Sequence, residues 1–133
     1  MKKTFLEGDV FSHEMNISGD LIDSFAELSS DYSKIHMEKD FAISKGFNDR
    51  IAHGNILNLM ISVLVGMKLG TQDVMLISQS IKYRHPIYED TTIILEGVVT
   101  HFSESVNMIE LKLIFYDELK KKVATGKCQC KLL

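Results

Sequence analysis

The chain of 133 residues has few of the features that mark specialised classes of protein. It contains one proline and two cysteines, and its net charge is −3. One proline leaves no proline-rich linker, and two cysteines are too few for the disulfide framework of a small secreted domain. Lysine and arginine do not gather into a long patch, so the sequence gives little electrostatic support for nucleic-acid binding.

Long apolar segments are also missing. The longest, residues 56–69, is shorter than the ~20 residues of a membrane-spanning helix and is interrupted by Asn58 and Ser62. Residues 1–4 are basic, but the polar residues 7–9 follow without the apolar core of a secretion signal. We therefore expect a cytoplasmic protein without a membrane partner.

The composition that remains is typical of one globular domain. Apolar residues make up 45% of the chain and charged residues 25%, which argues against disorder. At this length one domain, residues 1–133, buries a real but small core.

The first half of the chain predicts short elements followed by one long helix. A strand at 10–17 is expected at a sheet edge or exchanged with a second chain. Ser18 can cap a helix over residues 21–28, and a short helix over 39–45 should end at Gly46. The main helix, 54–69, is apolar nearly all round, which predicts that it is enclosed.

Three polar residues, Asn55, Asn58 and Ser62, interrupt that helix along one narrow stripe. A buried polar stripe is costly unless it is hydrogen-bonded, so it should face another polar feature. The alternative is that it faces a solvent gap or a strand edge.

The second half predicts only strands. Alternating or β-branched runs, separated by turn signals, cover residues 74–83, 91–102, 106–116 and 123–133. Cys128 and Cys130 would share one face of the last strand, where a structural role is favoured over metal binding. Several antiparallel strands after one buried helix predict an α+β fold in which a sheet curls around the helix.

One short window carries groups suited to acid–base chemistry. Asp31 and His36 lie five residues apart in a segment expected to be irregular, and Gly54 stands where the main helix begins. A carboxylate can act as general base and an imidazole as general acid, while a free N–H at a helix start can stabilise a developing oxyanion. The set suits the addition or removal of water beside a polarised carbonyl.

These residues match a known pattern. The segments Asp31-Tyr-Ser-Lys-Ile-His36, Phe41-Ala42 and Ile51-Ala-His-Gly54, with the strand 76–86 ending in Tyr-Arg-His-Pro, resemble the MaoC-like, hydratase-2 branch of the hot-dog fold. That family pattern reads roughly D-x-N-P-[ILV]-H-x-D-x-x-[FY]-A followed by I-A-H-G. The resemblance runs from about residue 23 to the C-terminus.

The chain departs from the family pattern at several positions. Ser33 and Lys34 replace the usual Asn-Pro, Glu38 replaces Asp, and Glu89 stands where a glycine is common. Losing the proline removes a constraint on the loop, and Ser33 replaces an amide that could brace it. These changes put loop order and substrate preference in question more than the chemistry.

The resemblance implies reversible syn addition of water to a trans-2-enoyl thioester, which gives an (R)-3-hydroxyacyl thioester. Asp31 would be the base, His36 the acid and Gly54 the oxyanion donor. Ser62 resembles a family serine that hydrogen-bonds the catalytic carboxylate. We expect Ser62, Asn58, Ala52 and His53 to contact the substrate, with His53 in a structural rather than a catalytic role.

The resemblance also implies a homodimer or a dimer of dimers with sites at the interface, and no metal or redox cofactor. The acyl group could be carried by coenzyme A or by an acyl carrier protein. With an acyl carrier protein, the enzyme would be a biosynthetic 3-hydroxyacyl dehydratase. Five basic residues could serve either carrier, so the sequence does not separate them: Lys34, Lys45, Arg50, Lys82 and Arg84. A non-catalytic acyl-thioester binding module and a thioesterase are the alternatives of other classes.

Overall fold

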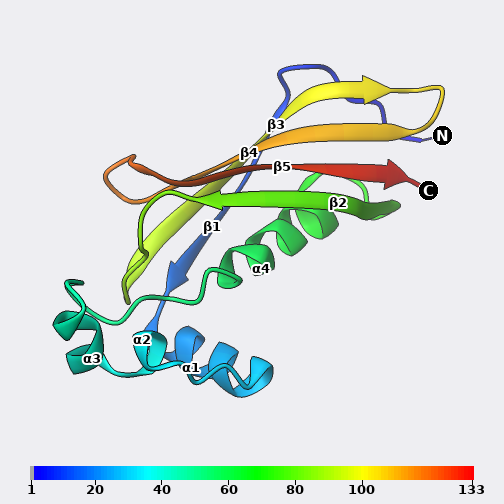
Figure 1. Ribbon diagram of the computed structural model, residues 1–133. Helices are drawn as coiled ribbons and strands as arrows, with labels where there is room; N and C mark the ends of the chain where they lie inside the picture. The colour runs from blue at the N-terminus through cyan, green and yellow to red at the C-terminus, as the bar shows by residue number, and fades with distance from the viewer. Residues whose placement is uncertain (1) are drawn as a thin grey trace.

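The computed structural model describes residues 2–133, which form one antiparallel sheet and a set of helices beside it (Figure 1). The strands lie in the order β1-β3-β4-β5-β2. Their bounds are β1 (Val10–Ile17), β2 (Val74–Tyr83), β3 (Thr91–Ser103), β4 (Met108–Tyr116) and β5 (Lys122–Leu132). The predicted strands are confirmed within one or two residues, and β1 lies at a sheet edge as expected.

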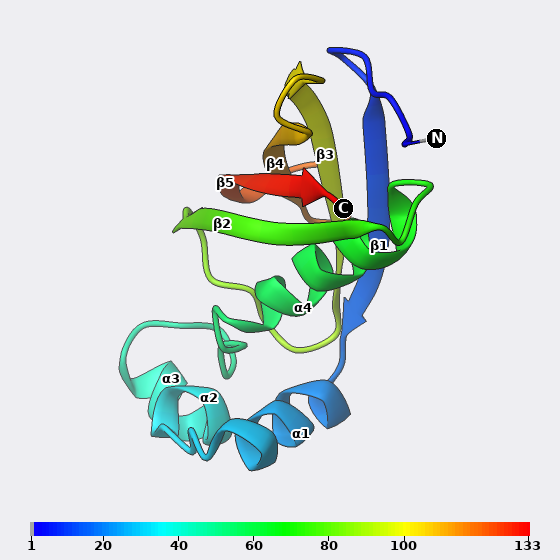
Figure 2. The same cartoon turned by 90° about the vertical axis from the view of Figure 1, so that its right-hand side faces the viewer.

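The sheet curls around the main helix, α4 (Ile56–Val63), as Figures 1 and 2 show. Register shifts interrupt the pairing of β3 with β4 between Val99 and His101, and that of β2 with β5 between Leu76 and Ser78. An extra residue in one strand bends it and increases its twist. The predicted α+β architecture is therefore confirmed.

The short helices also follow the prediction. Helix α1 (Gly19–Ser29) begins at Ser18, whose hydroxyl accepts a hydrogen bond from the Leu21 N–H at 3.1 Å, and ends at Ser30, which has a φ of 64°. Helix α3 (Lys39–Ser44) is followed by Gly46 with a φ of 94°. Between them the structure adds a four-residue helix, α2 (Lys34–Met37), where the sequence predicted an irregular segment.

The main helix differs from its prediction in two respects. It begins at Ile56, two residues after Gly54, and its last turns are the π-helical segment η1 (Leu64–Lys68). It is also not enclosed on all sides, because Leu59, Ser62 and Met67 are exposed. The sheet packs against one side of the helix, so the opposite side remains open to solvent in a single chain.

The core lies between the concave face of the sheet and α4. Its largest fully buried side chains include Phe115, Ile17, Ile22, Met60 and Leu64. Cys128 and Cys130 are both buried on the same face of β5, which confirms the prediction for their direction. Within residues 2–133 no helix has the length and hydropathy that a bilayer crossing requires.

Candidate active site

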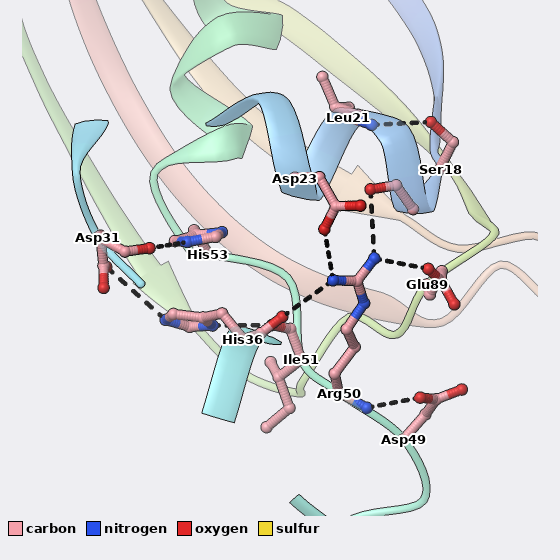
Figure 3. A network of polar contacts seen from close by, with 11 residues as sticks. Ser18, Leu21, Asp23, Asp31, His36, Asp49, Arg50, Ile51, His53 and Glu89 are labelled. Atoms are coloured by element: carbon pink, nitrogen blue, oxygen red, sulfur yellow. Dashed lines mark hydrogen bonds and ion pairs between the residues drawn. The ribbon is translucent and has the colours of Figure 1, made fainter. Parts of the chain in front are cut away.

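The proposed acid–base residues lie on a group of short helices at one end of α4. Helices α1, α2 and α3 cluster there, beyond the end of the sheet, in both views (Figures 1 and 2). Asp31 follows the end of α1, and His36 lies on α2. The segment that carries them is therefore partly helical rather than irregular, and the turn of α2 points the two side chains toward each other (Figure 3).

The Asp31 carboxylate is braced by Ser33. The Ser33 N–H donates to Oδ1 at 3.1 Å, and the Ser33 hydroxyl donates to the same oxygen at 2.5 Å. These hydrogen bonds favour the charged carboxylate and hold the pKa of Asp31 below its usual value, with the charges of His36 and His53 adding to the effect. Ser33 thus braces the turn, which the loss of the family's asparagine had put in question.

His36 is oriented by a backbone carbonyl. Its Nδ1 lies 2.7 Å from the Ile51 carbonyl oxygen, which can only accept, so Nδ1 carries the proton. The other ring nitrogen, Nε2, lies 3.9 Å from Oδ2 of Asp31. That separation is too long for a direct hydrogen bond, but both groups can hydrogen-bond one water between them.

His53 is buried and contacts both Asp31 and His36. Its side chain is only 3% exposed, and its Nε2 donates to the backbone carbonyl of Asp31 at 2.9 Å. Its ring stacks on that of His36, with centroids 4.0 Å apart, and the Phe25 ring lies tilted against it with centroids 4.8 Å apart. In the structure His53 is thus a buried hydrogen-bonding residue next to the helix start, and a contact with substrate stays a prediction.

Asp31, His36 and His53 also meet the spacing of a metal site, since one ligand atom of each lies within 4.8 Å of the others. The arrangement fits a metal poorly. The two imidazole rings are stacked at an interplanar angle of 27°, so their nitrogens do not converge on one point. His53 Nε2 is already bonded to a carbonyl, and its Nδ1 is buried without a partner among residues 2–133. That no metal takes part stays a prediction.

Asp31 and His36 line a cavity of about 560 Å³. Gly54 borders it, and within residues 2–133 no hydrogen bond uses the Gly54 N–H. The carbonyls of His53 and Gly54 accept from the first N–H groups of α4, so Gly54 sits on the turn that starts the helix. The lining residues are Phe25, Asp31, His36, Ile51, Ala52, His53, Gly54, Asn55, Tyr83, Arg84, His85, Pro86 and Ile87.

The remaining predicted substrate contacts are distributed unevenly. Ala52 borders the cavity. Asn58 accepts a hydrogen bond from Gln79 on the edge strand β2 at 2.6 Å and donates one to Asn55. Because Asn55 and Ser62 are exposed, the stripe faces solvent and a strand edge, which was the alternative expectation. Ser62 lies on the exposed face of α4. Ser33 is the side chain that hydrogen-bonds Oδ1 of Asp31 within residues 2–133, and the expected bond from Ser62 to Asp31 stays a prediction. A substrate contact for Ser62 and Asn58 stays a prediction.

Arg50 is the centre of a polar network beside the site (Figure 3). Its guanidinium contacts Asp23 and Glu89, each at 2.7 Å, and donates to the carbonyls of Gly19 at 3.2 Å and His36 at 3.4 Å. The side chain is 12% exposed. The interpretation of Arg50 as a cation for the acyl carrier is therefore wrong, since its donors are engaged inside the protein.

The sequence reading missed Ser33 as the brace of Asp31 and Tyr83 as a wall of the cavity. The spacing of Ser33 was a usable signal, because serine and aspartate side chains commonly bond to backbone groups two residues away. Tyr83 gave no signal, since its approach to Gly54 depends on how β2 packs beside the start of α4.

A family model for the MaoC-like domain matches residues 6–115. The chain belongs to the MaoC-like family. The (R)-specific enoyl-CoA hydratase of Aeromonas caviae is 27% identical over 109 residues, which are 82% of this chain and 81% of that protein. A protein of the same name from Rhodospirillum rubrum is 33% identical over 94 residues, 71% of this chain and 65% of that protein.

Other MaoC-like relatives bear other names. The mitochondrial 3-hydroxyacyl-[acyl-carrier-protein] dehydratase of Arabidopsis thaliana is 30% identical over 87 residues, 65% of this chain and 51% of that protein. Among solved structures, the Aeromonas caviae (R)-hydratase superposes with a TM-score of 0.92 at 23% identity, over 98% of this chain and 99% of that one. This likeness establishes the hot-dog fold.

Proposed function

We propose that the protein is a hydro-lyase that hydrates trans-2-enoyl-CoA thioesters to (R)-3-hydroxyacyl-CoA thioesters and catalyses the reverse dehydration. The observation that carries the proposal is the arrangement of Asp31 Oδ2 and His36 Nε2, 3.9 Å apart at the wall of a cavity that Gly54 also borders. The names of the relatives supply the substrate class and the configuration of the product.

The geometry supports a balanced addition of water. Ionised Asp31 takes one proton from a water held between it and His36, and the water oxygen forms a bond to C3 of the enoyl group. The C2–C3 π electrons shift toward the thioester, and C2 then receives a proton from Nε2 of a protonated His36. Nδ1 stays bonded to the Ile51 carbonyl, so Nε2 is the nitrogen that exchanges the proton.

Addition at C3 places negative charge on the thioester oxygen. The free N–H of Gly54 is suited to bind that oxygen, and the electron sink is the thioester itself. Such a donor is commonly worth about 10²–10³ in kcat. After the addition Asp31 holds a proton and His36 lacks one, and passage of that proton from Asp31 to His36 restores the starting state without any cofactor.

The same residues serve dehydration on an acyl carrier protein, the second candidate. The similarity to the Arabidopsis thaliana dehydratase favours keeping it. Because the Arg50 guanidinium pairs with Asp23 and Glu89, it is not available to the carrier. The other four basic residues suit either carrier: Lys34, Lys45, Lys82 and Arg84.

We also propose a homodimer, or a dimer of dimers, that completes the cavity. Among residues 2–133 the β2 strand pairs on one side only, with β5. That edge exposes Met75, Leu76 and Ile77, and the adjacent helix exposes Leu59 and Met67. An open strand edge with exposed apolar side chains is suited to pairing with a second copy.

The proposal is tested by incubating the protein with crotonyl-CoA and following loss of the enoyl-thioester absorbance, with chiral analysis of the product. Formation of (R)-3-hydroxybutyryl-CoA supports the proposal. If crotonyl-CoA is unchanged, longer enoyl-CoA esters and a crotonyl carrier protein are tried. Turnover of the carrier-protein substrate alone favours the dehydratase, and binding of all three without turnover contradicts an enzymatic role.

A further inference from the structure

We propose that Arg50 is a positioning residue. It holds the helical group α1–α3, which carries Asp31 and His36, against the segment 51–54. That segment carries the Ile51 carbonyl, which orients His36, and the Gly54 N–H, which is the proposed oxyanion donor. The inference rests on the proposed function and adds a residue that does not touch the substrate.

Apolar side chains of α1, Ile22 among them, pack into the core, but few hydrogen bonds join the helical group to the segment that begins α4. The helical group stands beyond the end of the sheet in both views (Figures 1 and 2). Three hydrogen bonds connect it to residues 51–53: from the Ile51 N–H to the Ile35 carbonyl, from His36 Nδ1 to the Ile51 carbonyl, and from His53 Nε2 to the Asp31 carbonyl. Each of them sets the position of the acid–base pair, and none of them involves a charged pair.

Arg50 lies directly before this segment and adds the charged connection. One guanidinium nitrogen bonds Asp23 on α1 and the His36 carbonyl on α2, and the other bonds Glu89 and the Gly19 carbonyl (Figure 3). A planar guanidinium can reach acceptors on several segments at once, which the point charge of a lysine cannot do. The Arg50 side chain therefore fixes α1, α2 and the loop before β3 in one arrangement.

The surroundings of Glu89 are adapted to this contact. A β-carbon at position 19 would overlap the Glu89 carboxylate, so Gly19 leaves room for the approach. Glu89 and Asp23 are two like charges held around one cation, and loss of the cation would leave them facing each other. Each of Arg50 and Glu89 thus neutralises the charge of the other. Glu89, which stands where the family commonly has glycine, has Arg50 as its structural partner.

The test compares Arg50→Lys and Glu89→Gln with a matched control, Lys39→Gln. Lys39 is an exposed lysine whose Nζ lies 3.9 Å from Oδ2 of Asp49. It contacts neither Asp31 nor His36. We expect kcat to fall about 10- to 100-fold in Arg50→Lys, less in Glu89→Gln, with KM nearly unchanged, because small displacements of reacting groups reduce chemistry more than binding. The control should match the wild type.

A second readout does not require activity. In protein with ¹⁵N-labelled histidine, the nitrogen shifts of His36 report which ring nitrogen carries the proton. With the spectra recorded at a pH where the His36 ring is neutral, we expect the Nδ1–H tautomer in the wild type, because Nδ1 faces the Ile51 carbonyl, and a mixture in Arg50→Lys. The temperature is one at which circular dichroism shows both proteins folded. An unchanged tautomer and unchanged kcat in folded Arg50→Lys would overturn the inference. If the wild type is inactive, the proposed function fails, and the tautomer alone decides the role of Arg50.

Discussion

Replacing Gly54 by alanine tests how the oxyanion donor is positioned. A β-carbon at this residue would lie 2.9 Å from Cζ and 3.0 Å from Cε1 of Tyr83, whereas ordinary contacts begin at 3.4 Å. Gly54 is not among the glycines with positive φ, so alanine introduces no backbone strain. The clash must be relieved by moving either the Tyr83 ring or the turn that aims the Gly54 N–H.

We expect a displacement of about half an ångström at the turn and a fall in kcat of about 10- to 100-fold, less than the 10²–10³ of a donor lost outright. Stopped-flow hydration of crotonyl-CoA measures kcat. Gly66→Ala is the matched control, because its β-carbon would meet open space. Adding Tyr83→Ala to the Gly54 variant removes the clash and should recover most of the rate. A kcat of Gly54→Ala within twofold of the wild type would refute the reasoning.

Three further predictions concern the brace, the strand edge and the core. Ser33→Ala removes a hydrogen bond that favours ionised Asp31, so the pKa of Asp31 should rise and the acid limb of the kcat/KM profile should move to higher pH, while Ser33→Thr should leave it in place. Ile77→Lys places a charge on the open β2 edge and should yield a monomer in sedimentation velocity, whereas an unchanged mass would contradict edge pairing. Ile22→Ala opens a cavity under α1 and should lower the free energy of unfolding by about 2–5 kcal/mol in urea titrations, and a cost below 1 kcal/mol would show that Ile22 is not part of a packed core.

The strands could be predicted from the sequence because their signals are local. The alternation in 10–17 and 74–83 gives β1 and β2 with the observed bounds. Helix α1 was equally clear, since Ser18 and the apolar spacing mark its start and its buried face. The four residues of α2 carry no periodicity that a pattern can detect, so that helix was missed.

The site could be predicted only as far as its residues lie close together in the sequence. Asp31, His36 and Gly54 fall within one window, whereas the Arg50 network joins Asp23 and Glu89, which are 66 positions apart. Such a network depends on tertiary packing. The same reason leaves the contact of Ser62 with Asp31 a prediction: the stripe that Ser62 shares with Asn58 gives its side of the helix, but not what packs there.

The central claim is that Asp31 and His36 act as a pair on one water. The most direct test is a double-mutant cycle of kcat for crotonyl-CoA hydration with Asp31→Asn, His36→Ala and the double variant, beside His101→Ala as a control away from the cavity. Groups that act as a unit give non-additive losses. The account predicts a loss of at least about 10³-fold in each single variant, a double variant no slower than the worse single one, and an unchanged control. Losses that multiply in the double variant, or a single variant that retains wild-type kcat, would contradict it.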